Sequence, residues 1–291
     1  MYTYTDLLNV CGVLTKDTSL ATQAYFKLWI NDTQKKVCKL MKGASFLEDE
    51  WVADSVASQE PYRLPHNYGK AIDVWYINGT TKYQPKLVES SEDWTYKSAL
   101  STTSDYPDYF HIFGDHIFFY PAFTTASLDI HLRYKKSIKE LGIADYSTGT
   151  VTVSNNSALV TGTGTAWTSL MVGRYLRFDD DGSWYEIYNV GSSTAITLVK
   201  TYEGNAVTNG TYKIGNISVI PDEFQDILWQ RPVAIYLMSK GEETRSNFYM
   251  GLYREGVNLL ISEYQSKTTN QVFTKTETER KNPNDYPTGL S

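Results

Sequence analysis

Three histidines carry the side chains best suited to bind a metal ion. His111 and His116 flank the dipeptide Gly114-Asp115, and a two-residue turn there would set both on one face of a hairpin. His131 falls on a later strand-like segment, so three imidazoles could meet and ligate zinc. Because the polar face of an exposed strand often carries histidine without metal, we predict no metal site and no cofactor.

Two acidic clusters offer a second kind of chemistry. Residues 179–181 are all aspartate and precede Gly182, but an EF-hand calcium loop needs ligands at alternate positions and a terminal glutamate. An Asp-Gly hairpin turn between two strand-like segments explains this run better. Glu48, Asp49 and Glu50 could mimic the carboxylate pair of a glycosidase. Adjacent acids at a surface bend are usually only solvated, so we predict no catalytic role for them.

Nucleotide chemistry and nucleophilic catalysis both lack their usual signatures. The sequence contains no glycine-rich loop of the GxGxxG or GxxxxGK[ST] type and no Gly-x-Ser-x-Gly elbow. Its two cysteines, Cys11 and Cys38, fall on helical patterns and can form neither a disulfide framework nor a CxxC metal site. We therefore predict that the protein is not an enzyme.

The composition describes a folded, acidic chain that is rich in aromatic residues. The 291 residues are 41% hydrophobic and 21% charged, with a formal net charge of −6. This charge disfavours tight wrapping of nucleic acid, which needs clustered Lys and Arg. No apolar run approaches the roughly 18 residues of a membrane span, and no secretion signal is recognised. The 23 Tyr and 7 Trp suit contact surfaces, although tyrosine is also common on half-buried strands.

The N-terminal part has the pattern of two helices. Thr5 and Asp6 are the candidate caps of a short first helix, and Thr18 or Ser19 begins a longer one that ends near Met41. Spacings of three and four draw an apolar stripe on the second helix, which we expect to pack on other elements. The stripe consists of Phe26, Ile30, Thr33, Val37 and Leu40.

The following part changes to a period of two, which is typical of strands. The clearest strand alternates Leu128, Ile130, Leu132 and Tyr134 with polar residues. Residues 108–120 predict a hairpin that turns at Gly114-Asp115. Another strand carries Ile72, Val74 and Tyr76 and leads to the hairpin dipeptide Asn78-Gly79.

A compositional shift near residue 148 predicts a small all-β module. Its six short runs, rich in Val, Thr, Ile and Tyr, cover residues 150–154, 158–162, 175–179, 184–190, 195–199 and 211–214. The bulk of its core is expected from Trp167, Trp184, Tyr185 and Tyr188. Because helical patterns resume directly after the module, we expect it to be an insertion.

Helical patterns return at Pro221, which with Asp222 and Glu223 suits a helix start. Its predicted stripe is Phe224, Ile227, Leu228, Ile235 and Met238. Pro232 should kink or split this helix, and a last helix is predicted over residues 242–267. Helices at both ends of the chain imply that they close into one bundle.

The last stretch, residues 268–291, shows neither period and is predicted to be an extended tail without fixed structure in the free subunit. Residues spaced like anchors for a partner's groove are Val272, Phe273, Tyr286, Pro287 and Leu290. A frayed terminus with scattered apolar residues is the alternative.

The predicted fold class is therefore α+β: a helical bundle from N- and C-terminal helices, a central antiparallel β region, an inserted small all-β module and an extended C-terminal tail. The expected parts are the N-terminal helices at residues 1–61, the β region at 62–147, the module at 148–216, the C-terminal helices at 217–267 and the tail at 268–291.

The order of these elements and several sequence phrases resemble the adaptor, or head-to-tail connector, proteins of tailed bacteriophages. The phrases lie at residues 62–65 (YRLP), 106–110, 118–121 (FFYP), 130–136 (IHLRYKK), 149–178, 184–190, 201–204 and 220–228 (IPDEFQDIL). The resemblance covers most of the chain up to residue 267. It implies a ring, commonly twelve-fold, under the portal, with a C-terminal segment that reaches the portal and no catalytic residues.

The resemblance implies a structural virion subunit at the head-tail junction, made in the cytoplasm of the host bacterium. Its expected partners are further copies of itself (a dodecamer), the portal protein and a tail or nozzle protein. We expect residues 268–291 to clamp the portal, and an acidic channel to let DNA pass without specific binding. Two alternatives stay open: a virion-surface binding module that recognises protein or glycan through residues 148–215, and a hydrolytic enzyme with a site at His111 or Asp179.

Overall fold

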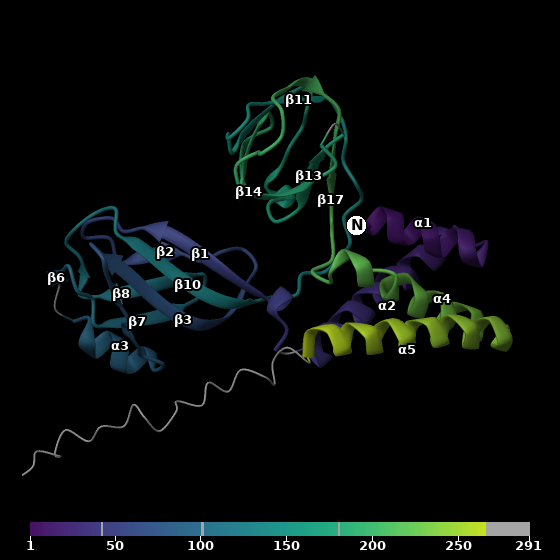
Figure 1. Ribbon diagram of the computed structural model, residues 1–291, viewed down its shortest axis with the longest axis horizontal. Helices are drawn as coiled ribbons and strands as arrows, with labels where there is room; N and C mark the ends of the chain where they lie inside the picture. The colour runs from purple at the N-terminus through teal and green to yellow at the C-terminus, as the bar shows by residue number, and fades with distance from the viewer. Residues whose placement is uncertain (42, 100–101, 180, 266–291) are drawn as a thin grey trace, which may run out of the picture.

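The computed structural model describes residues 1–41, 43–99, 102–179 and 181–265 (Figure 1). Over these residues the chain mixes helices with antiparallel sheets, as predicted. Figure 1 shows the long helices at the right, a β region at the left and the remaining strands above and between them. Among these residues we find no helix with the length and hydropathy that a bilayer span requires.

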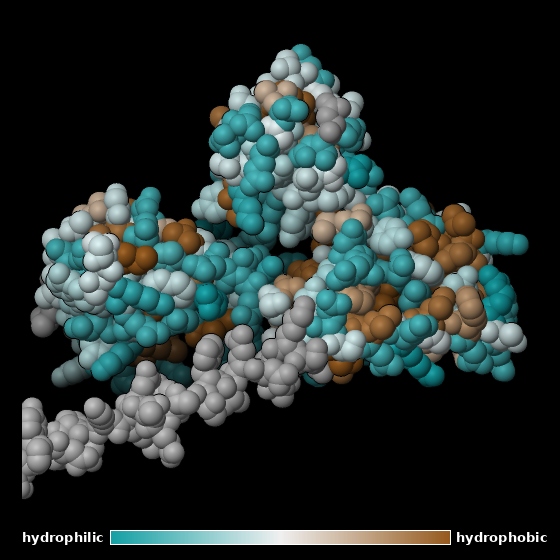
Figure 2. Space-filling view, in the orientation of Figure 1, coloured by the Kyte–Doolittle hydropathy of each residue, from teal (hydrophilic) through white to brown (hydrophobic). Residues whose placement is uncertain are grey.

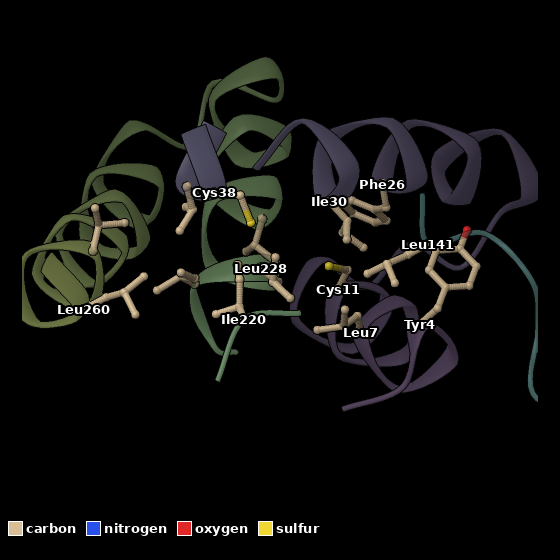
Figure 3. Close-up of a cluster of buried hydrophobic side chains, with 14 of the residues drawn as sticks. Tyr4, Leu7, Cys11, Phe26, Ile30, Cys38, Leu141, Ile220, Leu228 and Leu260 are labelled. Carbon is tan, nitrogen blue, oxygen red and sulfur yellow. The ribbon is translucent and has the colours of Figure 1, made fainter. Parts of the chain in front are cut away.

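Four helices from the two ends of the described chain share one hydrophobic core (Figure 3). They are α1 (Tyr4–Thr15), α2 (Leu20–Leu40), α4 (Ile227–Ser239) and α5 (Glu243–Gln265). α4 packs against each of the other three and therefore lies in the middle. In Figure 3, Leu228 of α4 lies between Leu260 of α5 and Cys11 of α1.

The helix starts follow local capping, with one correction. Thr3, and not Thr5, caps α1: its hydroxyl accepts from Asp6 N at 3.2 Å, and Thr3 N donates to the Asp6 carboxylate at 2.9 Å. A capping box requires the cap residue three positions before the acid, and Thr5 already lies inside the helix. Of the two predicted caps of α2, Thr18 and Ser19, it is Ser19 that caps the helix, by accepting from Thr22 N at 3.4 Å.

The buried face of α2 is rotated slightly about the helix axis relative to the predicted apolar stripe. The first four stripe residues are buried, but Leu40 is 55% exposed. Asn31 and Gln34 are buried instead, because they bind the backbone of the segment that follows the β region. Asn31 Nδ2 donates to Leu141 O at 2.7 Å, and Gln34 Nε2 donates to Lys139 O at 2.9 Å.

α4 differs from its prediction at both its start and its proline. Pro221 precedes a 3₁₀ turn, η3 (Asp222–Phe224), and the α-helix begins only at Ile227. Pro232 is buried inside an unbroken α4, so the predicted split is wrong. The packing of α4 against three neighbours supports the helix across the missing proline N–H. Met238 of the predicted stripe is 50% exposed, whereas its neighbour Leu237 is fully buried, so Leu237 takes the inward position in this turn of α4.

The β region consists of two four-stranded sheets around one core. The first has the order β1 (Glu48–Asp54), β10 (Asp129–Lys136), β3 (Tyr68–Asn78) and β4 (Thr81–Tyr83), and all its pairs are antiparallel. The second has the order β2 (Pro61–Arg63), β8 (His116–Tyr120), β7 (Tyr109–Phe113) and β5 (Lys86–Leu87), in which only the β5–β7 pair is parallel. β6 (Thr103–Ser104) pairs in parallel with β9 (Ala122–Phe123), and α3 (Ser91–Lys97) lies against β7. The predicted hairpins at Asn78-Gly79 and Gly114-Asp115 are confirmed.

Three features of the β region differ from prediction. The acidic run at residues 48–50 belongs to β1 and not to a surface bend, because it pairs with β10. Ile72 is 44% exposed, because the register of β3 slips by one residue and leaves it between the paired residues Ala71 and Asp73. α3 was not predicted, although Ser90 caps it in the usual way.

The inserted strands form one seven-stranded sheet with its own core. In sheet order they are β16 (Val207–Gly210), β11 (Thr150–Val153), β12 (Leu159–Thr163), β15 (Ala195–Leu198), β14 (Trp184–Ser192), β13 (Tyr175–Phe178) and β17 (Tyr212–Gly215), with a 3₁₀ turn, η2 (Ser169–Met171), before β13. All six predicted runs are confirmed as strands, and β16 was missed because it is short and polar. Tyr188 is 58% exposed and not in the core, because its neighbour Ile187 takes the inward position on β14.

Candidate assembly surfaces

The structure places the three histidines in separate environments. His111 and His116 share one face of the β7–β8 hairpin, as predicted, whereas His131 lies on the other sheet. His111 is buried and donates from Nδ1 to Val88 O at 2.7 Å, and its ring stacks on Trp94. In the described parts of the chain, no group of three or more His, Cys, Asp or Glu could hold a metal ion.

The acidic clusters make local ion pairs and hydrogen bonds. Neighbouring residues on β1 point to opposite faces of the sheet, so Asp49 pairs with Lys136 at 3.5 Å while Glu50 pairs with His131 at 2.8 Å. Asp181 accepts from the Tyr185 hydroxyl at 2.7 Å, next to the predicted turn at Gly182. Asp180 lies outside the described residues. Asp49 and Glu50 therefore lie on opposite faces of the sheet and do not face each other as a carboxylate pair.

The two cysteines lie in the helical core, as free thiols. Cys11 is fully buried in α1, and Cys38 is 4% exposed in α2. Burial raises the pKa of both thiols to about 12, which keeps them protonated and unreactive at neutral pH. The predicted portal anchors Val272, Phe273, Tyr286, Pro287 and Leu290 lie outside the described residues.

An exposed apolar surface covers the N-terminal half of α2. Leu20 is 85% exposed, Tyr25 57% and Leu28 64%. Ala24 lies between the two leucines at a spacing of four residues and is also exposed. We call these four residues the α2 face. They lie opposite the buried stripe, and Lys35, Lys36 and Lys39 continue the same side of the helix toward its C-terminus.

α5 carries a second exposed surface, which we call the α5 face. It consists of Phe248, Gly251, Glu255 and Leu259, which follow one side of the helix at spacings of three and four. Phe248 is 61% exposed and Leu259 is 55% exposed. Figure 2 shows hydrophobic atoms gathered on the helical part at the right of the view.

Neither face is among the surfaces predicted from the sequence, because those predictions follow the buried stripes of the helices. The signal was present in the spacing of Leu20, Ala24 and Leu28, which puts three apolar residues on the side of the helix opposite Phe26 and Ile30. Because α2 is apolar on two opposite sides, we expect a packing partner on each of them.

A groove separates the β region from the inserted sheet. Its volume is about 690 Å³, and its lining includes Asp49, Trp51, His66, Tyr134, Glu186 and Tyr188. His66 Nε2 lies 3.1 Å from Glu186 Oε1 and joins the two parts. Burial, together with the carboxylates of Asp49 and Glu186, raises the pKa of Tyr134 and Tyr175, so both phenols stay protonated. The groove thus offers aromatic rings beside acidic groups.

A family model described as SU10 adaptor protein matches residues 2–163. None of the curated proteins searched matches the chain. The matched segment contains α1, α2, the β region and the first two strands of the inserted sheet, while α4 and α5 follow it.

Proposed function

Because the chain belongs to the SU10 adaptor protein family, we propose that this phage structural protein forms a ring that joins the portal to the tail around the DNA channel. The α2 face is the observation that carries this proposal. It exposes large apolar side chains on a helix that is already packed on its other side, which is typical of a subunit that packs against a neighbour.

In the proposed assembly the protein works by contact and not by catalysis. We propose that α1, α2, α4 and α5 act as one helical bundle, that the inserted strands are a separate small module, and that about twelve copies close the ring, as in the adaptors the sequence resembles. The partners are the portal on one side and a tail or nozzle protein on the other.

Electron microscopy of the purified full-length protein, alone and mixed with portal, tests the ring. We expect closed rings whose symmetry matches that of the portal. A protein that stays single at high concentration, and that does not bind the portal, contradicts the proposal.

We also propose that residues 268–291 bind the portal through Val272, Phe273, Tyr286 and Leu290. A segment that orders on its partner loses conformational entropy, but repetition around a ring compensates through avidity. Removing residues 268–291 is expected to leave folded subunits that no longer load onto portal-bearing heads. Alanine at Val272 and Phe273 should weaken loading, while alanine at Thr268 and Thr269 serves as the control. Normal loading by the truncated protein excludes this role.

A virion-surface binding module is the second candidate function. The groove beside the inserted sheet favours it, because Tyr188 and Trp51 line the groove next to acidic side chains that could accept from sugar hydroxyls. Glycan-array binding by the full-length protein that is lost in a Tyr188→Ala variant would support it. Binding that persists in this variant, or no binding at all, would exclude this use of the groove.

A further inference from the structure

We propose that the α2 face of one copy packs against the α5 face of the next copy, as a head-to-tail contact that repeats around the ring. This inference rests on the proposed ring and specifies which surfaces form it. The two faces differ in composition and belong to different helices, so the contact is heterologous. Heterologous contacts close into rings, whereas a contact between identical faces stops at a dimer.

The two faces point to different sides of the helical part. α4 lies between α2 and α5 and packs against both, and the exposed side of each outer helix is the side turned away from this core. A neighbour can therefore occupy both sides of one subunit at once, as each member of a ring must.

The two helices run in the same direction within one subunit. Phe46, just after α2, contacts Tyr264 near the end of α5, with ring centroids 5.0 Å apart. At the opposite end, Arg245 near the start of α5 donates to Leu14 O at 2.9 Å, close to the turn that leads into α2. Figure 1 shows both helices ending beside the β region. Successive members of a large ring differ by a small rotation, so α2 and the neighbour's α5 also meet close to parallel.

In a parallel contact, the apolar residues and the charged residues of the two faces come level with each other. Leu28 and Phe248 are the central apolar residues of their faces, and when they lie side by side Lys35 is level with Glu255. Lys39 then lies one turn beyond Glu255. Gly251 leaves room beside Phe248, since a Cβ added there would meet no atom within 4 Å.

The charges of the two C-terminal halves are complementary. α2 carries Lys35, Lys36 and Lys39, of which the first two already pair with Glu140 and Asp32. Lys39 and Glu255 form no ion pair within the described residues. They are therefore available to each other across the contact, which favours a second copy over another occupant of the α2 face.

Cysteine cross-linking tests the contact directly. The natural cysteines are buried, so Leu28→Cys and Phe248→Cys would be the exposed thiols. Under mild oxidation we expect the double variant to give a ladder of covalent multimers from dimer upward, and each single variant to stay monomeric on denaturing gels. Cross-linked dimers from the Leu28→Cys variant alone would show that α2 faces meet each other and would overturn the proposal.

A charge exchange provides the second test. Lys39→Glu and Glu255→Lys are each expected to lower the ring fraction at least several-fold, and the double variant should recover most of it. Leu28→Glu should abolish rings while leaving the circular dichroism spectrum unchanged, whereas Leu170→Glu, at a residue 73% exposed in the 3₁₀ turn η2, should assemble normally. If the wild-type protein forms rings but these variants do too, the ring stands and this contact is wrong. If no rings form, even with portal, the proposed function itself fails.

Discussion

Asn31 is a buried polar side chain that attaches the segment after the β region to α2. Its Nδ2 donates to Leu141 O at 2.7 Å and its Oδ1 accepts from Leu141 N at 2.8 Å, so one amide satisfies both backbone groups of Leu141. Asn31→Leu leaves these groups buried without partners. We expect it to lower the free energy of unfolding by about 2 kcal/mol.

Urea unfolding followed by far-ultraviolet circular dichroism measures this change. The control is Asn9→Leu, because Asn9 is exposed on α1, and its effect should stay within about 0.5 kcal/mol. An Asn31→Leu protein as stable as the control would show that the hydrogen bonds to Leu141 make no net contribution to the free energy of unfolding.

Asp17 makes the stability of the α1–α2 turn depend on pH. Its carboxylate accepts from the Tyr236 hydroxyl at 2.7 Å, from Ser19 N at 3.0 Å and from the Thr22 hydroxyl at 2.8 Å. These hydrogen bonds hold the pKa of Asp17 well below its ordinary value, and the bond from Tyr236 has the largest effect. The stabilisation is therefore fully present above the unfolded pKa of about 3.9 and is lost as the pH falls below it.

We expect Asp17→Asn to lower the urea midpoint at neutral pH, and the difference from wild type to shrink as the pH falls from neutral to about 3. Comparing the two proteins at each pH removes the titration of all other groups. A difference that stays constant over this range would contradict the assignment.

Some elements with a local signal follow the prediction, whereas α3 and the cap at Thr3 have a local signal and still depart from it, and strands that depend on distant contacts depart from it too. The hairpin at Gly114-Asp115 and the cap at Ser19 need only neighbouring residues, and both are confirmed. β1 was missed because its strand character comes from pairing with β10, about eighty residues later in the chain. The exposure of Ile72 likewise follows from a register slip against β10 that no local pattern shows.

The candidate surfaces were predictable in part. The abundant tyrosines suit either contact surfaces or half-buried strands, and Tyr76, Tyr202 and Tyr212 follow the second alternative because they fill the cores of the two β parts. The apolar spacing of Leu20, Ala24 and Leu28 was visible in the sequence. Which side of α2 is covered depends on how α4 packs, and this is a property of the fold.

The inserted sheet extends beyond the predicted start at residue 148. Tyr146 exchanges backbone hydrogen bonds with Ile214 at 2.9 and 2.7 Å, and its hydroxyl accepts from Ala166 N at 2.7 Å. Arg174 is buried and donates to Ala144 O at 2.7 Å. Residues 144–147 are therefore held to the sheet by hydrogen bonds. We propose that the module begins at residue 144 and not at residue 148.

A pair of fragments tests this boundary. Residues 144–216 are expected to fold alone, with a cooperative thermal transition at least several degrees above that of residues 148–216, because the shorter fragment leaves Arg174 and the edge of β17 without these partners. Tyr146→Ala in the longer fragment should reproduce most of the loss. Equal melting temperatures would place the boundary at residue 148.

The helical part connects the other two. A backbone hydrogen bond from Tyr4 N to Asn216 O, at 2.8 Å, joins α1 to the end of the inserted sheet, and the 3₁₀ turn η1 (Ser45–Leu47) leads from the end of α2 into β1. Both β parts are thus attached to a framework of α1, α2, α4 and α5.

The net charge of −6 determines how such a ring should treat DNA. Proteins that bind duplex DNA without sequence preference do so with a Kd of about 10⁻⁴–10⁻⁶ M at physiological salt, by neutralising phosphates with Lys and Arg. An acidic subunit repels phosphate, so a channel lined by it lets DNA pass without retention. We therefore expect no change in the fluorescence anisotropy of a labelled duplex at micromolar protein and physiological salt. A variant with Glu60→Lys and Glu203→Lys, two exposed acids outside the α2 and α5 faces, serves as the matched control for added positive charge. Binding by the wild-type protein that weakens as salt is raised would show that basic groups line the channel, and would contradict passage without retention.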